Sequence, residues 1–326
     1  MTLATPEKLT NPNFTTGTEG GVAGSWSTAT VSAPPAGYVE VPSNALYANP
    51  ATYDATQPSK SNFLTMQYEA KYDCTSTPDG IGDTAATCSA PADSGAGLDY
   101  RDISGFTTSR VVSTAIGAPI VHITQTQAIS ACPTGYHLIT NNEWMTVARN
   151  TEGQTANWAN GVLDSTVASG GGLKRGNVEE TTVVGYNGAD PEQGTGRDTK
   201  AKLVLSNGAE LWDLSGNVYE WNSDTILGQN KPDSAQTAAW IEWTYFNSAG
   251  NYGTLSYDLT RPTDVDWNAD YGMGRYYMGA RTSGTTYAFR RGGNWLNASD
   301  AGVFALSLVF LPVRATPLAF VAPVIP

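Results

Sequence analysis

The side chains best suited to redox or metal chemistry are three cysteines and two histidines. Cys74 and Cys88 enclose a short polar loop, whereas Cys132 stands alone, and no Cys-x-x-Cys pair is present. In an oxidising compartment a disulfide between Cys74 and Cys88 would contribute about 3 kcal/mol of stability; otherwise the two are unrelated surface thiols. His122 and His137 each lie in an apolar stretch, where histidines are usually packed in a core. We therefore expect neither a zinc site nor a His-based catalytic triad.

Two acidic residues flank a turn within residues 210–221, Glu-Leu-Trp-Asp-Leu-Ser-Gly-Asn-Val-Tyr-Glu-Trp. Asp213 and Glu220 lie on either side of the Ser-Gly-Asn turn, close to backbone carbonyls. Carboxylate and carbonyl oxygens are the ligands that Ca²⁺ prefers. The alternative is that both carboxylates accept hydrogen bonds from turn amides and from arginines near the C-terminus. A second acidic loop, residues 79–83, lacks the spacing of a calcium loop.

Composition indicates a loop-rich globular protein. Of the 326 residues 40% are hydrophobic and 15% are charged, with 34 Gly, 9 Trp and 16 Tyr. The net charge of -12 disfavours nucleic acid as a partner, because phosphate recognition needs a basic face. Residues 1–60 are rich in Thr, Ser, Ala, Pro and Gly, which predicts an N-terminal arm or linker before one domain over residues 61–326.

The elements that must position these residues are short. Residues 37–42 and 62–71 alternate between apolar and polar side chains, which predicts strands. Capping boxes predict two main helices that begin after Thr124 and Thr140, each with Gln or Glu three residues later. Together with the long Gly-rich loops, these signals predict an α+β fold with small antiparallel sheets.

The segment near the C-terminus divides into scaffold and loop. Gly292 and Gly293 allow the backbone to turn, and Trp295 is an anchor for the chain that follows. Residues 303–308, Val-Phe-Ala-Leu-Ser-Leu, are apolar enough for a strand buried on both faces. Repeated prolines and Arg314 then indicate loop and edge strand, and they argue against a membrane span.

Three motifs resemble one protein family. They are the Arg-Gly-Gly-Asn-Trp and Ala-Gly-Val-Phe-Ala-Leu-Ser-Leu sequences within 290–308, the Gly-Tyr-His-Leu-Ile-Thr-Asn-Asn-Glu-Trp sequence at 135–144, and residues 210–221. Together they resemble the variable proteins of diversity-generating retroelements, which have a C-type-lectin fold of the formylglycine-generating-enzyme (sulfatase-modifying factor) subtype. The resemblance covers residues 60–326, but residues 318–321 read Leu-Ala-Phe-Val where the family has Ile-Gly-Phe-Arg.

In that family an error-prone reverse transcriptase rewrites adenine-rich codons at the 3′ end of the gene, and the rewritten positions form the ligand surface. The resemblance implies a variable region over about residues 294–320 on a scaffold of Gly292, Gly293 and Trp295. It implies as rewritten positions Leu296, Asn297, Asp300, Ser307, Val309, Phe310, Arg314, Thr316 and Leu318, with Ser299 and Val313 as further candidates.

The resemblance also implies a structural calcium ion. The residues that match its ligands are Asp213 and Glu220 by their carboxylates, and Gly216 and Val218 by their carbonyls. It further implies that the first strand of the domain, near residues 63–71, pairs with a C-terminal strand near residues 318–322.

Enzymes of the formylglycine-generating type oxidise a substrate cysteine with a cysteine pair just after the Gly-Gly-x-Trp motif. The matching residues 296–302 contain no cysteine, and a fold without its reactive residues does not carry the activity. We therefore expect no enzymatic activity and no required cofactor. The remaining alternatives are a catalytic or inactive relative of that enzyme, and a surface adhesin of fixed specificity.

The implied variable positions are mainly apolar, with Leu296, Val309, Phe310 and Leu318 beside Arg314. A hydrophobic patch with a charged rim is typical of a protein-binding surface, unless Phe310 and Leu318 turn into the core. The expected function is that of a monomeric receptor for a protein on another cell or virus. We expect it at a cell surface, secreted or on a virion.

Overall fold

The computed structural model describes the chain in ranges separated by gaps. These are residues 33–43, 62–73, 98–100, 103, 105–115, 119–178, 201–233, 239–249, 252–256, 259–311, 318–319 and 323–324. The chain divides into two compact units, Met1–Ala33 and Pro34–Pro326. Only Ala33 of the first unit is described, so every element below belongs to the second.

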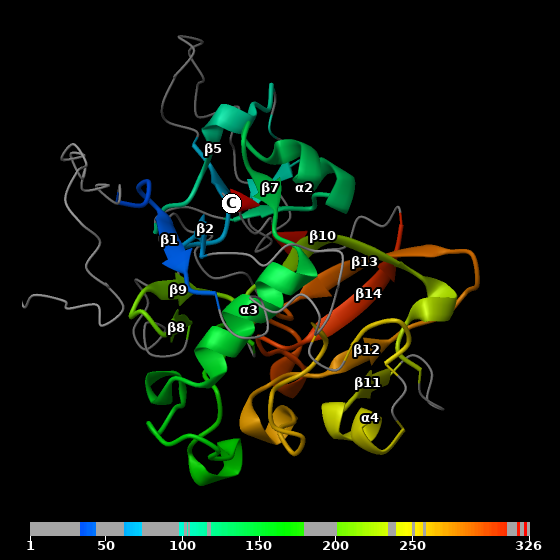
Figure 1. Ribbon diagram of the computed structural model, residues 1–326. Coiled ribbons are helices and arrows are strands. Elements are labelled where there is room, and N and C mark those ends of the chain that lie inside the picture. The colour runs from blue at the N-terminus through cyan, green and yellow to red at the C-terminus, as the bar shows by residue number, and fades with distance from the viewer. Residues whose placement is uncertain are drawn as a thin grey trace, which may run out of the picture. The chain divides into compact units, whose positions relative to one another are not determined.

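The largest sheet in the described ranges has six strands in the order β11-β12-β14-β13-β10-β15 (Figure 1). Its strands are β10 (Tyr219–Leu227), β11 (Ala239–Ile241), β12 (Tyr276–Met278), β13 (Thr286–Arg291), β14 (Leu306–Phe310) and β15 (Leu318–Ala319). β14 pairs antiparallel with β13 and parallel with β12, while β15 pairs parallel with β10. The sheet is therefore mixed, and its centre is built from the C-terminal motif.

Five two-stranded sheets are also described. They pair β1 (Tyr38–Val41) with β2 (Phe63–Met66), β3 (Lys71–Tyr72) with β5 (Val111–Val112), β4 (Leu98–Asp99) with β6 (Ile120–Val121), β7 (His137–Leu138) with β16 (Pro323–Val324), and β8 (Lys202–Val204) with β9 (Glu210–Trp212). All five are antiparallel except β4 with β6.

The α-helices of the described residues are α2 (Gln125–Ala131), α3 (Asn141–Glu152) and α4 (Trp243–Ala249). Both predicted capping boxes are present. The hydroxyls of Thr124 and Thr140 accept hydrogen bonds from the amides of Gln127 and Glu143, whose side chains accept from the capping residues' amides in return. Short 3₁₀ turns are η3 (Thr108–Arg110), η4 (Thr155–Asn157), η5 (Val167–Ser169), η7 (Gly228–Asn230), η9 (Ala269–Tyr271) and η10 (Ala298–Asp300).

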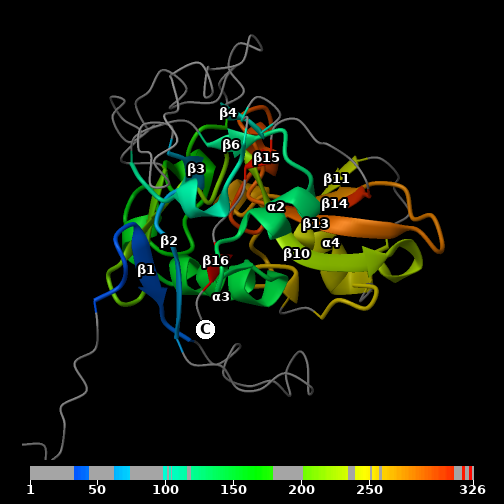
Figure 2. The ribbon, with the colours of Figure 1, turned by 90° about the horizontal axis from the view of Figure 1, so that it is seen from above.

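Helix α2 lies beside β10 (Figure 2). Gln125 Nε2 donates hydrogen bonds to the carbonyl oxygens of Asn222, at 2.5 Å, and Asp224, at 2.8 Å. A buried amide side chain thus satisfies two carbonyls of the strand, as burial requires. Among the described residues no helix has both the length and the apolar character to cross a bilayer.

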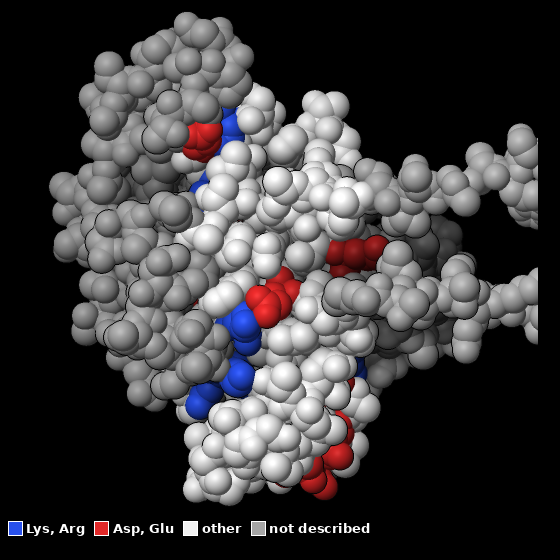
Figure 3. All heavy atoms as spheres, turned by 90° about the vertical axis from the view of Figure 1, so that its left-hand side faces the viewer, with Lys and Arg blue, Asp and Glu red and all other residues white. Residues whose placement is uncertain are grey.

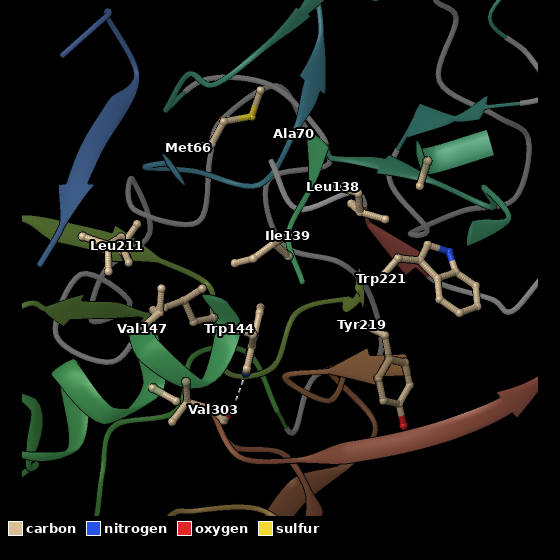
Figure 4. Packing of buried hydrophobic residues seen from close by; sticks show 14 of the residues in the cluster. Met66, Ala70, Leu138, Ile139, Trp144, Val147, Leu211, Tyr219, Trp221 and Val303 are labelled. Atoms are coloured by element: carbon tan, nitrogen blue, oxygen red, sulfur yellow. Dashed lines mark hydrogen bonds between the residues drawn. The ribbon is translucent and has the colours of Figure 1, made fainter. Parts of the chain in front are cut away.

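Buried apolar side chains form two main clusters. The first surrounds α3 and includes Trp144, Trp221 and Val303 (Figure 4). Trp144 Nε1 donates a hydrogen bond to the carbonyl of Val303 at 2.8 Å, which fixes the C-terminal motif against the helix. The second cluster lies between the six-stranded sheet and α4, with Trp243 and Phe246 at its centre. On the face in Figure 3, charged side chains of both signs are scattered among uncharged ones.

The prediction of a loop-rich α+β fold is confirmed, with two differences in its parts. Helix α4 was not predicted, because no capping box precedes it in the sequence. The sheets are also not all antiparallel, because β12 and β14, like β10 and β15, are joined by long crossovers that allow parallel pairing.

Two strand predictions need correction. Strand β2 pairs with β1 rather than with residues 318–322, because the short strand in residues 37–42 supplies its antiparallel partner. β15 pairs with β10 instead. The strand predicted at residues 303–308 begins at Leu306 and continues to Phe310. The apolar run correctly indicated burial but not the start of the strand. Val303 and Phe304 are fully buried, but they lie in a turn before the strand begins.

Candidate ligand-binding surface and calcium site

Gly292 and Gly293 form the turn that leads into the predicted ligand loop. Their φ angles of 81° and 85° are left-handed values that residues with a Cβ rarely adopt. A Cβ on Gly292 would collide with Glu220 Oε2, and one on Gly293 would lie 2.7 Å from Ala301. Both positions therefore require glycine, for backbone conformation and for space.

The loop after this turn is held by hydrogen bonds. Trp295 is only 7% exposed, and its amide donates to the carbonyl of Asn217 at 3.1 Å. Asn294 Oδ1 accepts from the amide of Leu296 at 3.1 Å, and Asn297 Oδ1 accepts from the amide of Asn294 at 2.8 Å. The Leu296 side chain is nevertheless 67% exposed, more than any other large hydrophobic side chain in the described ranges. The loop thus presents an apolar side chain on a fixed backbone.

The other predicted surface positions differ in exposure. Phe310 is 51% exposed, so its side chain does not turn into the core. Asn297, Asp300 and Val309 are half-buried, and Ser299 is exposed. Outside the described residues lie Val313, Arg314, Thr316 and the side chain of Leu318, together with both cysteines of the predicted disulfide, Cys74 and Cys88.

Ser307 does not lie on the exposed surface, in contrast to the prediction. Its side chain is 1% exposed, and its hydroxyl accepts a hydrogen bond from Arg290 Nη2 at 2.9 Å. The guanidinium of Arg290 lies over the ring of Tyr219, 4.2 Å from its centroid. Arg290 is the register partner of Ser307 on β13, so its side chain lies on the same face of the sheet and covers the hydroxyl. Ser307 therefore belongs to the packing beneath the surface.

Leu296 and Phe310 lie near opposite ends of β14. Leu306, the first residue of the strand, is opposite Arg291 just before the glycine turn, whereas Phe310 is opposite Tyr287. Four residues of strand span about 13 Å. The exposed apolar positions thus define an elongated surface, which we call the ligand surface, rather than one compact patch.

Charged side chains lie beside the Leu296 end of the ligand surface. Arg275 Nη1 donates to Asp300 Oδ1 at 2.7 Å, and its Nε is paired with Glu242. Arg175 Nη1 donates to the carbonyl of Ala298 at 3.0 Å. This part of the surface therefore has a charged rim, whereas Arg314, the charged position named from the sequence, lies outside the described residues.

The turn between β9 and β10 buries its acidic residues. Asp213 is 2% exposed and Glu220 is fully buried. Left-handed φ angles at Asp213, Gly216 and Asn217 make the turn tight. Both carboxylate oxygens of Glu220 are buried, and neither has a hydrogen-bond partner among the described residues. In the described part of the chain, neither turn amides nor arginines therefore hold the Glu220 carboxylate, which is half of the alternative stated for Asp213 and Glu220.

The surroundings of Glu220 disfavour its ionised form. Burial, followed by the charges of Glu69 and Asp213, raises the pKa of Glu220 well above its usual value. The backbone amide of Glu220 acts in the opposite direction and lowers this pKa, although it does not form a hydrogen bond with the carboxylate. Within the described ranges no three His, Cys, Asp or Glu side chains are grouped to hold a metal alone. A calcium ion would need Asp213, Glu220 and the carbonyls of Gly216 and Val218, and it would neutralise buried charge.

Glu69 is a member of this site that the sequence prediction missed. It is 5% exposed, and its Oε2 accepts a hydrogen bond from Asn217 Nδ2 at 2.8 Å. The sequence did contain a signal for Glu69. This acidic residue lies within the predicted strand 62–71, close to the apolar residues Met66 and Ala70, which are both buried. An acidic residue in such a place indicates a buried charge with a specific partner.

The structure places His122, His137 and Cys132 in three different environments. His122 is 5% exposed, as predicted for a core histidine. His137 is not in the core, because its side chain is 41% exposed and its Nε2 lies 3.1 Å from the buried Glu143 carboxylate. Burial raises the pKa of the Cys132 thiol to about 12, so it is uncharged and a weak nucleophile at neutral pH.

Comparison of the chain with protein-family models and with curated proteins gives no match. A functional assignment therefore depends on the geometry of the site and on the motif resemblance.

Proposed function

We propose that this domain has the C-type-lectin-like fold of the formylglycine-generating-enzyme subtype. The mixed α+β architecture is compatible with it, and the three motifs meet in space. The amide of Gly216 donates to the carbonyl of Gly292 at 3.2 Å, which joins the second motif to the C-terminal one. Arg291 Nη2 donates to Asn141 Oδ1 at 2.6 Å, which joins the C-terminal motif to the helix of the first. Motifs that belong to one family fold should converge in this way.

On this fold we infer a receptor that binds a protein ligand through the ligand surface. The observation that carries this inference is the exposure of Leu296 on a loop whose backbone is already ordered by Gly292, Gly293 and Trp295. An ordered loop loses little conformational entropy on binding, and exposed apolar side chains with a charged rim suit a protein partner. The same scaffold can carry many different side chains at the exposed positions without refolding.

The proposal includes diversification of these positions by a retroelement, and the absence of enzymatic activity. The second part is supported by the unreactive environment of Cys132 and by the lack of cysteine in residues 296–302. Calcium has a structural role in this proposal. The partner is a protein on another cell or virus rather than a nucleic acid, so the receptor acts at a cell surface, in secreted form or on a virion.

The experiment that tests this function is to sequence codons 290–326 in many copies of the gene from its source population, together with the DNA downstream. We expect variation at codons 296, 297, 300, 309 and 310, fixed codons for Gly292, Gly293 and Trp295, and a nearby near-repeat that differs only at adenines. A single invariant 3′ end without such a repeat would leave a fixed-specificity adhesin or an inactive enzyme relative.

Codon 307 provides a sharper test within the same data. The burial of Ser307 against Arg290 favours an invariant residue at this position. If the domain folds as described, this codon should be fixed or should vary only among small residues. Free variation there, including large side chains, would contradict the placement of Ser307 beneath the ligand surface.

A further inference from the structure

A row of register partners crosses four strands of the six-stranded sheet, from β11 through β12 and β14 to β13. Trp240 is opposite Tyr277, Tyr277 is opposite Ser307, and Ser307 is opposite Arg290. Residues directly opposite each other share a face of a sheet, and the rings of Trp240 and Tyr277 are 5.2 Å apart between centroids. Leu306, the neighbour of Ser307, belongs to the cluster beside α4, so the row lies on the face away from α4.

This row continues the ligand surface. Val309 follows Ser307 by two residues, so it lies on the same face, and it is one of the half-buried positions of the ligand surface. Trp240, Tyr277 and Arg290 are half-buried as well, so a partner on this face can contact them. Trp, Tyr and Arg are the residue types that contribute most of the energy in protein interfaces.

Trp240, Tyr277 and Arg290 also lie outside the expected variable region, residues 294–320. They would therefore be the same in every variant of the surface, whatever residues the rewritten positions carry. We call these three residues the fixed row.

The guanidinium of Arg290 is held in place but is only partly paired. Its Nη2 donates to Ser307 at 2.9 Å, and its plane lies over the ring of Tyr219. Nε is buried without a partner among the described residues, and Nη1 also lacks one there but is not enclosed. The ion pairs in the described ranges join other residues, so no carboxylate there neutralises this cation. A fixed guanidinium with free donors matches the two oxygens of a carboxylate.

We propose that Arg290 is a fixed anchor for a side-chain carboxylate of the protein ligand, and that Trp240 and Tyr277 contact the apolar groups beside it. The rewritten positions then distinguish one ligand from another, while the fixed row supplies a contact that all ligands share. The net charge of -12 does not prevent this, because charges farther than about 8 Å are largely screened at physiological salt. The identity of the partner rests on the proposed ligand-binding function, whereas the carboxylate site can be tested without that partner.

Two matched peptides test the site on the full chain. The probe is acetyl-Leu-Glu-Leu-amide, and its neutral counterpart is acetyl-Leu-Gln-Leu-amide, so the two differ only in the carboxylate. Nuclear magnetic resonance follows the indole N–H of Trp240 and the Nε–H of Arg290 in the isotope-labelled protein during titration. We expect saturable shifts of both signals with the Glu peptide and about 10-fold weaker binding of the Gln peptide, because a hydrogen bond to a charged group is lost.

The substitution Arg290→Gln removes the cation and should make the two peptides bind equally. Arg281→Gln is the matched control, because the Arg281 side chain is 25% exposed and already paired with Asp233. This control should keep the preference for the Glu peptide. The Trp240 indole reports binding in all three proteins.

Three results would overturn the proposal. They are equal or absent binding of the two peptides by the wild type, binding that leaves the Trp240 and Arg290 signals unmoved, and a preference for the Glu peptide that persists in Arg290→Gln. The first two need no variant, so the test stands even if Arg290→Gln does not fold. Variable codons without a peptide preference would remove only the carboxylate site. Invariant codons 290–326 with a clear preference would remove the diversified receptor and leave this site supported.

Discussion

Arg291, the last residue of β13, donates two hydrogen bonds to the side-chain oxygen of Asn141 at the start of α3. Nε lies 3.0 Å and Nη2 lies 2.6 Å from Asn141 Oδ1. The guanidinium also donates to three backbone carbonyls at 2.9, 3.1 and 3.2 Å. Burial lowers the pKa of Arg291 to about 9, although the nearby Asp224 carboxylate opposes this. One buried side chain thus fixes the strand before the glycine turn against α3.

Replacing Arg291 by Lys should lower the free energy of unfolding by about 2–4 kcal/mol. An ammonium group cannot reproduce the planar donor fork, so several buried acceptors lose their partners. Urea denaturation measures the effect. The control is Arg281→Lys, because Arg281 is 25% exposed and should cost less than about 1 kcal/mol. Similar losses in both variants would show that the buried fork has no special importance.

Gly292→Ala should be more destabilising than Gly284→Ala. Both glycines have left-handed φ angles, 81° and 75°, so alanine costs about 1–2 kcal/mol in backbone strain at either position. At Gly284 nothing lies within 4 Å of the added Cβ, whereas at Gly292 it meets Glu220 Oε2. The difference between the two unfolding free energies therefore isolates the steric clash. Equal values would mean that Glu220 can move aside without cost.

Thr140→Ala should lower the free energy of unfolding by about 1 kcal/mol, the usual effect of losing a helix N-cap. The Thr140 hydroxyl accepts from the amide of Glu143 at 3.2 Å, and the Glu143 carboxylate accepts from the amide of Thr140 at 2.8 Å. Thr140→Ser keeps this oxygen and should restore most of the stability. Thermal or urea unfolding of the two variants measures the difference. A loss of the same size in Thr140→Ser would assign the effect to the methyl group instead.

Features that depend on neighbours in sequence could be predicted, and the capping boxes at Thr124 and Thr140 show why. A hydroxyl and a carboxylate or amide three residues apart meet whenever a helix forms, whatever surrounds it. The glycine turn at residues 292–293 is similar, because only glycine readily adopts its φ angles. Burial of Phe304 also followed from its apolar neighbours, although its turn conformation did not.

Features that depend on distant segments could not be predicted in the same way. Nothing near residue 318 in the sequence specifies β10 as its neighbour, and nothing near Ser307 specifies that Arg290 will cover it. The electrostatic coupling of Glu69 to Glu220 joins residues that only the fold brings together. For this reason, the apolar and turn-forming residues of the candidate site, and Asp213 and Glu220, were identified from sequence, while Glu69 and Arg290 were not.

The ligand surface should tolerate changes that the strand beneath it does not. Leu296→Ser should change the free energy of unfolding by less than about 0.5 kcal/mol, because the side chain is 67% exposed. Leu308→Ala should cost about 2–5 kcal/mol, because Leu308 is 2% exposed and belongs to the cluster beside α4. Urea denaturation of both variants checks this contrast. A large loss for Leu296→Ser would make this residue part of the fold rather than a free position.

Lys231 should make stability rise with pH above about 8. Its side chain is fully buried, donates to the carbonyl of Ala280 at 2.9 Å and lies over the ring of Tyr287. Burial, followed by the charge of Arg281, lowers the pKa of Lys231 from 10.5 to about 8. Between these values the unfolded chain still binds the proton that the folded chain has lost, so folding becomes more favourable as pH increases.

The variant Lys231→Met cannot titrate and provides the comparison for this effect. The unfolding free energy of the wild type minus that of Lys231→Met should be constant below pH 8 and should increase toward pH 10.5. At about 1.4 kcal/mol per pH unit, the full increase is about 3.5 kcal/mol. Tyrosines titrate in the same range in both proteins, so their contribution cancels in the difference. If the difference stays flat from pH 7 to 10.5, Lys231 keeps its proton in the folded state, and the bonds to carbonyls and ring outweigh its burial.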